Sequence, residues 1–141
     1  MIWTFLDQYR DKGLLFLRIG YGLAYIVFHG GPKLIGGPER WERIGSAMAS
    51  LGIHFLPKFW GFMAGFSESF GGILLILGFF TRPACVMIAF VMLVATLRNL
   101  GGERGFFSAA HSIENGIVLL ALILIGPGRY ALDEVLKGRR K

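Results

Sequence analysis

The residues of this chain best suited to chemistry are ionisable groups inside apolar segments. Glu68 lies near the middle of the apolar stretch 59–80, between two serines. A helix rises about 1.5 Å per residue, so this stretch would span roughly 33 Å, enough to cross the hydrocarbon core of a bilayer. A carboxylate at that depth is costly unless it is paired, protonated or hydrated. We therefore interpret Glu68 as a candidate functional residue, and a purely structural carboxylate between helices is the alternative.

The first apolar segment carries a stripe of basic and aromatic side chains. Positions 18, 22, 25, 29 and 33 share one face of a helix, and they hold Arg18, Gly22, Tyr25, His29 and Lys33. Such a face on a lipid-compatible helix must point toward protein. For Arg18 the alternative is snorkelling to the nearer surface, and for His29 it is a structural role.

Two later segments add three more candidates. Arg98 lies at the end of one, and His111 and Glu114 stand one turn apart on the same face of the other. If both termini lie on one side, the helical rise places Glu68 about 13 Å and Glu114 about 10 Å below the opposite surface. Six candidates then gather in that half of the bilayer: His29, Lys33, Glu68, Arg98, His111 and Glu114.

This cluster predicts a polar pocket in the outer half of the bilayer. We expect Glu68 to depend mainly on His29, and Glu114 to be balanced by Arg98 and His111. Carboxylate and imidazole groups both exchange protons, as the site of a quinone head group or a proton relay would require. The ligand-binding candidates are Arg18, Tyr25, His29, Lys33, Glu68, Arg98, His111 and Glu114.

The elements that must position these residues are four apolar helices. The expected spans are about 13–32, 57–80, 83–100 and 106–126. Between the first two spans, residues 38–51 show the pattern of a short amphipathic helix at the membrane surface, over the mouth of the pocket. The predicted fold class is all-α: a single domain over residues 1–141, an integral membrane four-helix bundle with one short amphipathic interfacial helix.

Composition agrees with a membrane protein and argues against other classes. Of the 141 residues, 54% are hydrophobic and 17% are charged, whereas soluble domains carry about 25% charged residues. The net charge of +6 comes without a basic stripe interleaved with aromatics, so we expect no nucleic-acid partner. The single cysteine rules out an intramolecular disulfide. We expect no metal site and no intrinsic cofactor, because nothing resembles a metal cage and two histidines are weak evidence for haem.

The basic residues predict an orientation. Eight lie on the side of the two termini and six on the opposite side, with a compact basic tail after Gly138. Because basic residues favour the cytoplasmic side, we expect an integral cell-membrane protein with both termini in the cytoplasm.

Several segments together resemble a known family. LRIGYGLAYIVFHGGPKL, the glutamate-bearing span ending in LGFFTRP, GERGFF with His111 and Glu114, and the terminal GPGRYALD are similar to the DoxX family of small four-helix membrane proteins. The resemblance covers nearly the whole chain. It implies a four-helix protein of the cell inner membrane, and some members are linked to quinol oxidation or thiosulfate:quinone oxidoreduction, usually as a small partner subunit.

Three functional hypotheses follow. The first is a membrane subunit that holds a quinone-like or other small amphiphile beside a redox partner protein. The second is a proton-coupled small carrier that uses Glu68 and Glu114; four spans leave little room for alternating access unless the protein is a homo-oligomer. The third is a structural or assembly factor in the lipid bilayer without a ligand of its own. The sequence leaves open whether the protein is an enzyme.

Overall fold

The computed structural model describes residues 3–103 and 105–138, which form helices joined by turns, with no strand in either range. Four helical segments are long and apolar enough to cross a membrane: Thr4–Ile35, Pro57–Leu77, Thr81–Leu100 and Gly105–Ile125. The predicted all-helical fold with four membrane-length helices is confirmed.

The first segment is continuous but not uniform. It comprises η1 (Thr4–Tyr9), α1 (Arg10–Ala24), the π-helix η2 (Tyr25–Gly30) and α2 (Gly31–Ile35). Pro32 has no N–H, and in an α-helix its ring would clash with the carbonyl group four residues earlier. A wider π turn just before the proline accommodates that clash. The helix therefore continues past Pro32 and carries Lys33 with it.

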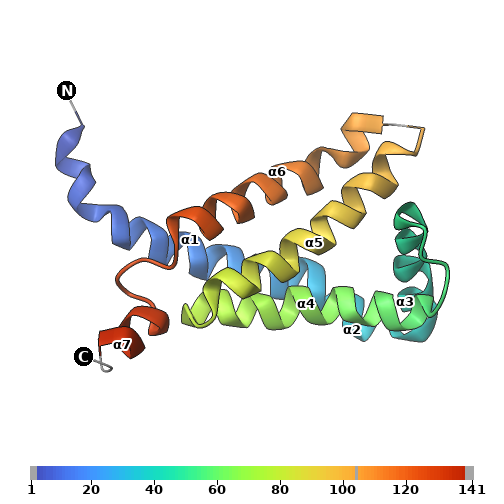
Figure 1. Ribbon diagram of the computed structural model, residues 1–141, viewed down its shortest axis with the longest axis horizontal. Helices are drawn as coiled ribbons and strands as arrows, with labels where there is room; N and C mark the ends of the chain where they lie inside the picture. The colour runs from blue at the N-terminus through green and yellow to red at the C-terminus, as the bar shows by residue number, and fades with distance from the viewer. Residues whose placement is uncertain (1–2, 104, 139–141) are drawn as a thin grey trace.

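The connection between the first two spans crosses the end of the bundle as α3 (Gly37–Gly45) followed by the 3₁₀-helix η3 (Ser46–Leu51) (Figure 1). Two glycines let α3 lie against α4 (Pro57–Leu77) with backbone touching backbone. A Cβ on Gly45 would overlap the Pro57 carbonyl group, and a Cβ on Gly61 would overlap the Trp41 backbone. The start of the connection is therefore fixed to α4.

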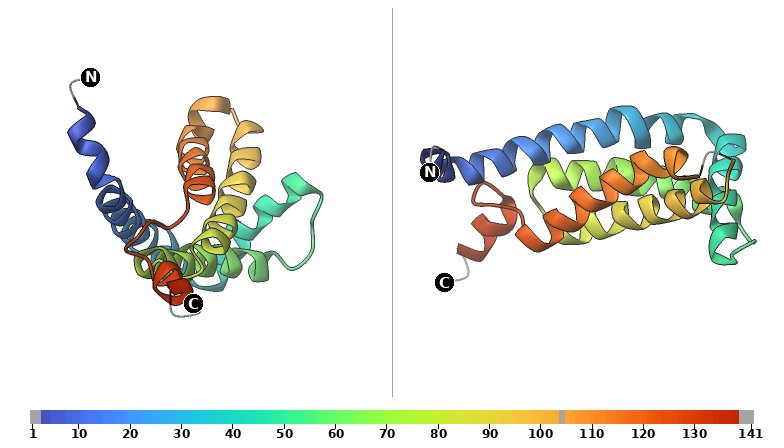
Figure 2. Two further views of the ribbon diagram at one scale, coloured as in Figure 1. Left: turned by 60° about the vertical axis from the view of Figure 1, so that its left-hand side comes forward. Right: turned by 90° about the horizontal axis from the view of Figure 1, so that it is seen from above.

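The spans do not close into a ring. Figure 2 shows α1 along α4 and α6 (Gly105–Ile125) along α5 (Thr81–Leu100), so that α1 and α6 form two arms that diverge from the α4–α5 pair. The fully buried apolar side chains come mainly from α4, α5 and α6: Leu75, Ala84, Cys85, Ile88, Ala109 and Leu119. Large apolar side chains on the outside, such as Phe16, Phe107 and Leu124, are exposed, as a lipid-facing surface requires.

At the other end of the molecule the C-terminal segment docks on the α4–α5 turn. The Asp133 carboxylate, in α7 (Leu132–Gly138), accepts hydrogen bonds of 2.9 and 3.0 Å from the Phe80 and Thr81 backbone N–H groups at the start of α5. The Arg129 backbone N–H donates to Asp11 of α1 at 3.0 Å. Both η1 and α7 therefore lie at one end of the bundle, opposite α3 (Figure 1).

Candidate functional site

An ion pair between α2 and α4 lies at the centre of the candidate site. Lys33 Nζ donates to Glu68 Oε1 at 2.7 Å; the Glu68 side chain is 0% exposed and that of Lys33 is 21% exposed. The second carboxylate oxygen, Oε2, has no hydrogen-bond partner among the residues that the structure describes. The expectation that Glu68 depends mainly on His29 is therefore wrong. The helix runs through Pro32 instead of breaking there, and this continuity brings Lys33 onto α4.

Small residues allow the first segment to approach Glu68 so closely. A Cβ on Gly30 would overlap Ser69, and one on Gly65 would press on the Lys33 and Leu34 side chains. Contacts between small residues are a usual way for membrane helices to pack tightly. The glycines thus hold η2 and α2 against the turn of α4 that carries Glu68.

Aromatic and imidazole rings form a column between the first segment and α6. The ring centroids of Tyr21 and Tyr25 lie 5.2 Å apart, those of Tyr25 and His29 lie 5.4 Å apart, and His29 stacks on His111 at 5.1 Å. Tyr21 Oη donates to Asn115 Oδ1, while the buried Tyr25 hydroxyl has no partner within the described ranges. We call Tyr21, Tyr25, His29, His111 and Asn115 the polar column.

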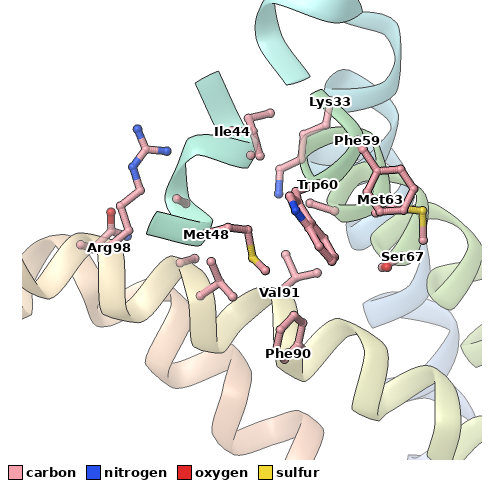
Figure 3. A pocket seen from close by; sticks show the side chains of 16 residues that line it. Lys33, Ile44, Met48, Phe59, Trp60, Met63, Ser67, Phe90, Val91 and Arg98 are labelled. Atoms are coloured by element: carbon pink, nitrogen blue, oxygen red, sulfur yellow. The ribbon is translucent and has the colours of Figure 1, made fainter. Parts of the chain in front are cut away.

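A cavity of about 470 Å³ is lined by Lys33 of α2 and by residues of α3, η3, α4 and α5. Figure 3 shows the Lys33 ammonium group pointing into it beside Trp60, with Arg98 at its edge. Most of the wall is apolar, and the main contributors are Met48, Trp60, Met63, Phe90, Val91 and Val94. Its polar lining comes from Lys33, Ser67, Arg98 and Asn99. The sequence predicted a polar pocket, whereas this cavity is mostly apolar with a charged end.

The structure distributes the predicted residues over several places. Lys33 and Arg98 line the cavity, and Arg98 Nη1 donates to the Arg43 carbonyl at 3.4 Å. Tyr25, His29 and His111 belong to the polar column, and Glu68 lies buried next to Lys33.

Two of the predicted residues lie apart from the others. Arg18 is fully buried near the opposite end of the bundle, where its Nη2 donates to the Tyr130 carbonyl at 2.9 Å. Glu114 is exposed and forms no ion pair with the described residues, Arg98 included.

Sequence reasoning missed several residues of the site, and for most of them a signal was present. Asn115 lies four residues after His111 and thus on the same helix face. Trp60, Met63 and Ser67 recur at spacings of three and four along α4, which predicts a shared face. The π turn could have been suspected from Pro32. Within residues 3–103 and 105–138 no group of three or more His, Cys, Asp or Glu side chains could hold a metal ion.

Comparisons with known proteins agree on one family. A family model described as DoxX matches residues 13–99. The chain is 35% identical over 116 residues to an uncharacterized membrane protein of Mycobacterium tuberculosis, covering 73% of this chain and 66% of the relative. It is 33% identical over 134 residues to the inner membrane protein YphA of Escherichia coli, covering 88% of this chain and 90% of the relative. No solved structure matches the chain.

Proposed function

This chain belongs to the DoxX family of membrane proteins, and from that premise we propose that its cavity binds a small membrane amphiphile with a quinone-like head group. The observation that carries the proposal is the position of Lys33. Its ammonium group lines a mostly apolar cavity and is hydrogen-bonded to the fully buried Glu68. A site for an amphiphile needs this combination of one fixed polar contact and a long apolar wall.

The polar end of the cavity fits the oxygens of a quinone ring. A lysine ammonium has three N–H donors, and one of them is directed at Glu68. The others are available to a carbonyl oxygen of a ligand. Ser67 and Asn99 line the same cavity and offer a hydroxyl and an amide for a second oxygen.

The apolar wall fits the ring and tail of the same ligand. Met48 and Met63 are flexible side chains that adapt to irregular apolar shapes. Phe59 and Phe90 line the cavity and are also about half exposed on the outside of the helices. A tail can therefore leave the cavity toward lipid without crossing a polar surface.

A bound quinone would supply the capacity to take up two electrons and two protons. The electrons would come from a redox partner protein, so that this chain acts as a small accessory subunit of a quinone-linked system. Its own residues would position the head group through Lys33 and hold a proton at Glu68.

We also propose that both termini lie in the cytoplasm. Because η1 and α7 lie at the same end of the bundle (Figure 1), we place both termini on the same side of the membrane. The excess of basic residues that the sequence assigns to that side favours the cytoplasm. A reporter enzyme that is active only outside the cytoplasm, fused after Lys141, should be inactive. Full activity of that fusion would contradict the orientation.

The proposal is tested by identifying what the protein carries after purification in mild detergent. We expect mass spectrometry to find a quinone at a near-stoichiometric ratio to the wild type. Val91→Phe, which fills the cavity wall, should lose it, whereas Val86→Phe on the exposed face of the same helix should retain it. Equal retention in both variants, or no bound amphiphile in the wild type, would contradict the proposal and favour an assembly factor.

A further inference from the structure

The helices that the Lys33–Glu68 pair joins border two different environments. The apolar cavity lies on the Lys33 side, and the polar column reaches from Tyr25 and His29 to α6. We propose that His29 and His111, which are not among the residues that line the cavity, conduct protons between Glu68 and the membrane surface. The inference rests on the proposed function, because the cavity ligand is what would consume the proton.

Two buried oxygens next to the column lack partners. Glu68 Oε2 and Tyr25 Oη make no hydrogen bond with the described residues. Buried polar atoms are rarely left unsatisfied, and each such atom costs about 1–3 kcal/mol. Internal water that links these oxygens to the imidazoles would satisfy both and provide a path for protons.

The surroundings of Glu68 contain the groups that such a path needs. Lys33 Nζ lies 2.7 Å from the Glu68 carboxylate, and Gly30, the residue after His29, packs against Ser69, the residue after Glu68. Cys85 of α5 is buried in the same core cluster as Tyr25. Since imidazole takes up and releases protons near neutral pH, His111 and its stacking partner His29 are the suitable carriers.

The column ends at a side chain that the described helices leave exposed. His111 is exposed and lies six residues from the start of α6, about 9 Å along the helix axis. Its ring stacks on His29, which belongs to the π-helix. Single π turns occur often at functional sites, and here the π turn carries the two rings, Tyr25 and His29, that extend from Glu68 toward α6.

The proton balance is simple. The Lys33 ammonium group, which lines the cavity, would give a proton to a ligand oxygen and regain one from protonated Glu68. The Glu68 carboxylate, which pairs with Lys33 at rest, would be protonated by His111 by way of His29. The imidazole then takes a proton from water at the surface. Reduction of one quinone uses this cycle twice, with two electrons supplied by a reduced partner protein.

The test follows protonation of Glu68 directly by time-resolved infrared spectroscopy after a rapid pH jump. The band that disappears in Glu68→Gln identifies the carboxyl group. In His111→Ala we expect its response to slow at least tenfold and to recover on addition of free imidazole, because the described helices leave the His111 side chain exposed. His54→Ala, which removes an exposed histidine from the loop before α4, is the matched control and should respond like the wild type.

Three results would overturn the inference. The first is a Glu68 infrared band that does not change with pH in the wild type. The second is a Glu68 response in His111→Ala as fast as in the wild type, and the third is a slowed response in His111→Ala that imidazole does not restore. Val91→Phe separates this inference from the proposed function: it should lose the ligand but keep the fast pH response. The wild type could carry no ligand while His111→Ala still slows the Glu68 response and imidazole restores it. That result would contradict the proposed function alone.

Discussion

Lys33 Nζ lies 2.7 Å from Glu68 Oε1, and this contact joins two helices at the wall of the cavity. The carboxylate is wholly buried while the lysine reaches the cavity. Breaking a buried ion pair by removing one partner is far more damaging than replacing both partners with apolar groups. The pair is therefore both a structural contact and a group that a ligand would meet.

Replacement of Lys33 alone should destabilise the protein. In Lys33→Met the Glu68 carboxylate loses its charge partner, and we expect a loss of about 3–5 kcal/mol in the free energy of unfolding. Lys58→Met is the control, because the Lys58–Glu42 pair is exposed on both sides at 3.6 Å and should contribute little. Denaturant unfolding in detergent measures both.

The double variant Lys33→Met/Glu68→Leu should recover most of that stability, because no buried charge is left unpaired. It should nevertheless bind quinone at least tenfold more weakly than the wild type, as an equilibrium titration would show. A double variant that is stable and binds normally would show that the pair serves packing alone.

The packing of α3 against α4 should depend on glycine at position 45. In Gly45→Ala the new methyl group meets the Pro57 carbonyl, and overpacking of this kind costs about 1–3 kcal/mol. Gly20→Ala meets nothing within 4 Å and should be neutral or slightly stabilising, since alanine favours helix. Because α3 and η3 wall the cavity, Gly45→Ala should also weaken ligand binding. Equal stability of the two variants would contradict the close contact.

Much of the fold could be predicted because lipid imposes a simple pattern. Apolar stretches of membrane length, separated by short Gly- and Pro-containing turns, leave little choice except helices. The segment 38–51 was predicted as one helix, and its second half is a 3₁₀-helix from Ser46. The resemblance carried by LRIGYGLAYIVFHGGPKL and GFFTRP identified the family correctly.

The partners within the site were harder to predict. The stripe from Arg18 to Lys33 follows an α-helical period with a break expected at Gly30–Pro32, whereas the helix continues there through a π turn at Tyr25–Gly30 that changes the period. The helical rise predicts that Glu114 and Arg98 lie at similar depths in the bilayer. Depth alone does not say which way a side chain points around its helix axis, and the Glu114 side chain is exposed. The cavity wall depends on how α3 and η3 fold back, which is a tertiary contact without a local pattern.

The cap formed by Asp133 should hold the C-terminal segment in place. Its carboxylate accepts from two backbone N–H groups at the start of α5, and removal of a helix cap costs about 0.5–2 kcal/mol. In Asp133→Ala we expect that loss, with faster proteolysis after Gly126. Glu134→Ala, whose carboxylate pairs only with the exposed Lys137 among the described residues, should be cleaved at the wild-type rate. Equal cleavage of both variants would show that the cap does not secure the segment.

The most direct measurement for the central claim is an equilibrium titration with a short-tailed quinone, followed by quenching of Trp60 fluorescence in Trp3→Phe/Trp41→Phe protein. Trp60 lines the cavity with Lys33. We predict saturable quenching with one quinone per chain, and at least tenfold weaker binding in the stable Lys33→Met/Glu68→Leu background. Quenching that rises linearly without saturation, and equally in both proteins, would contradict the account.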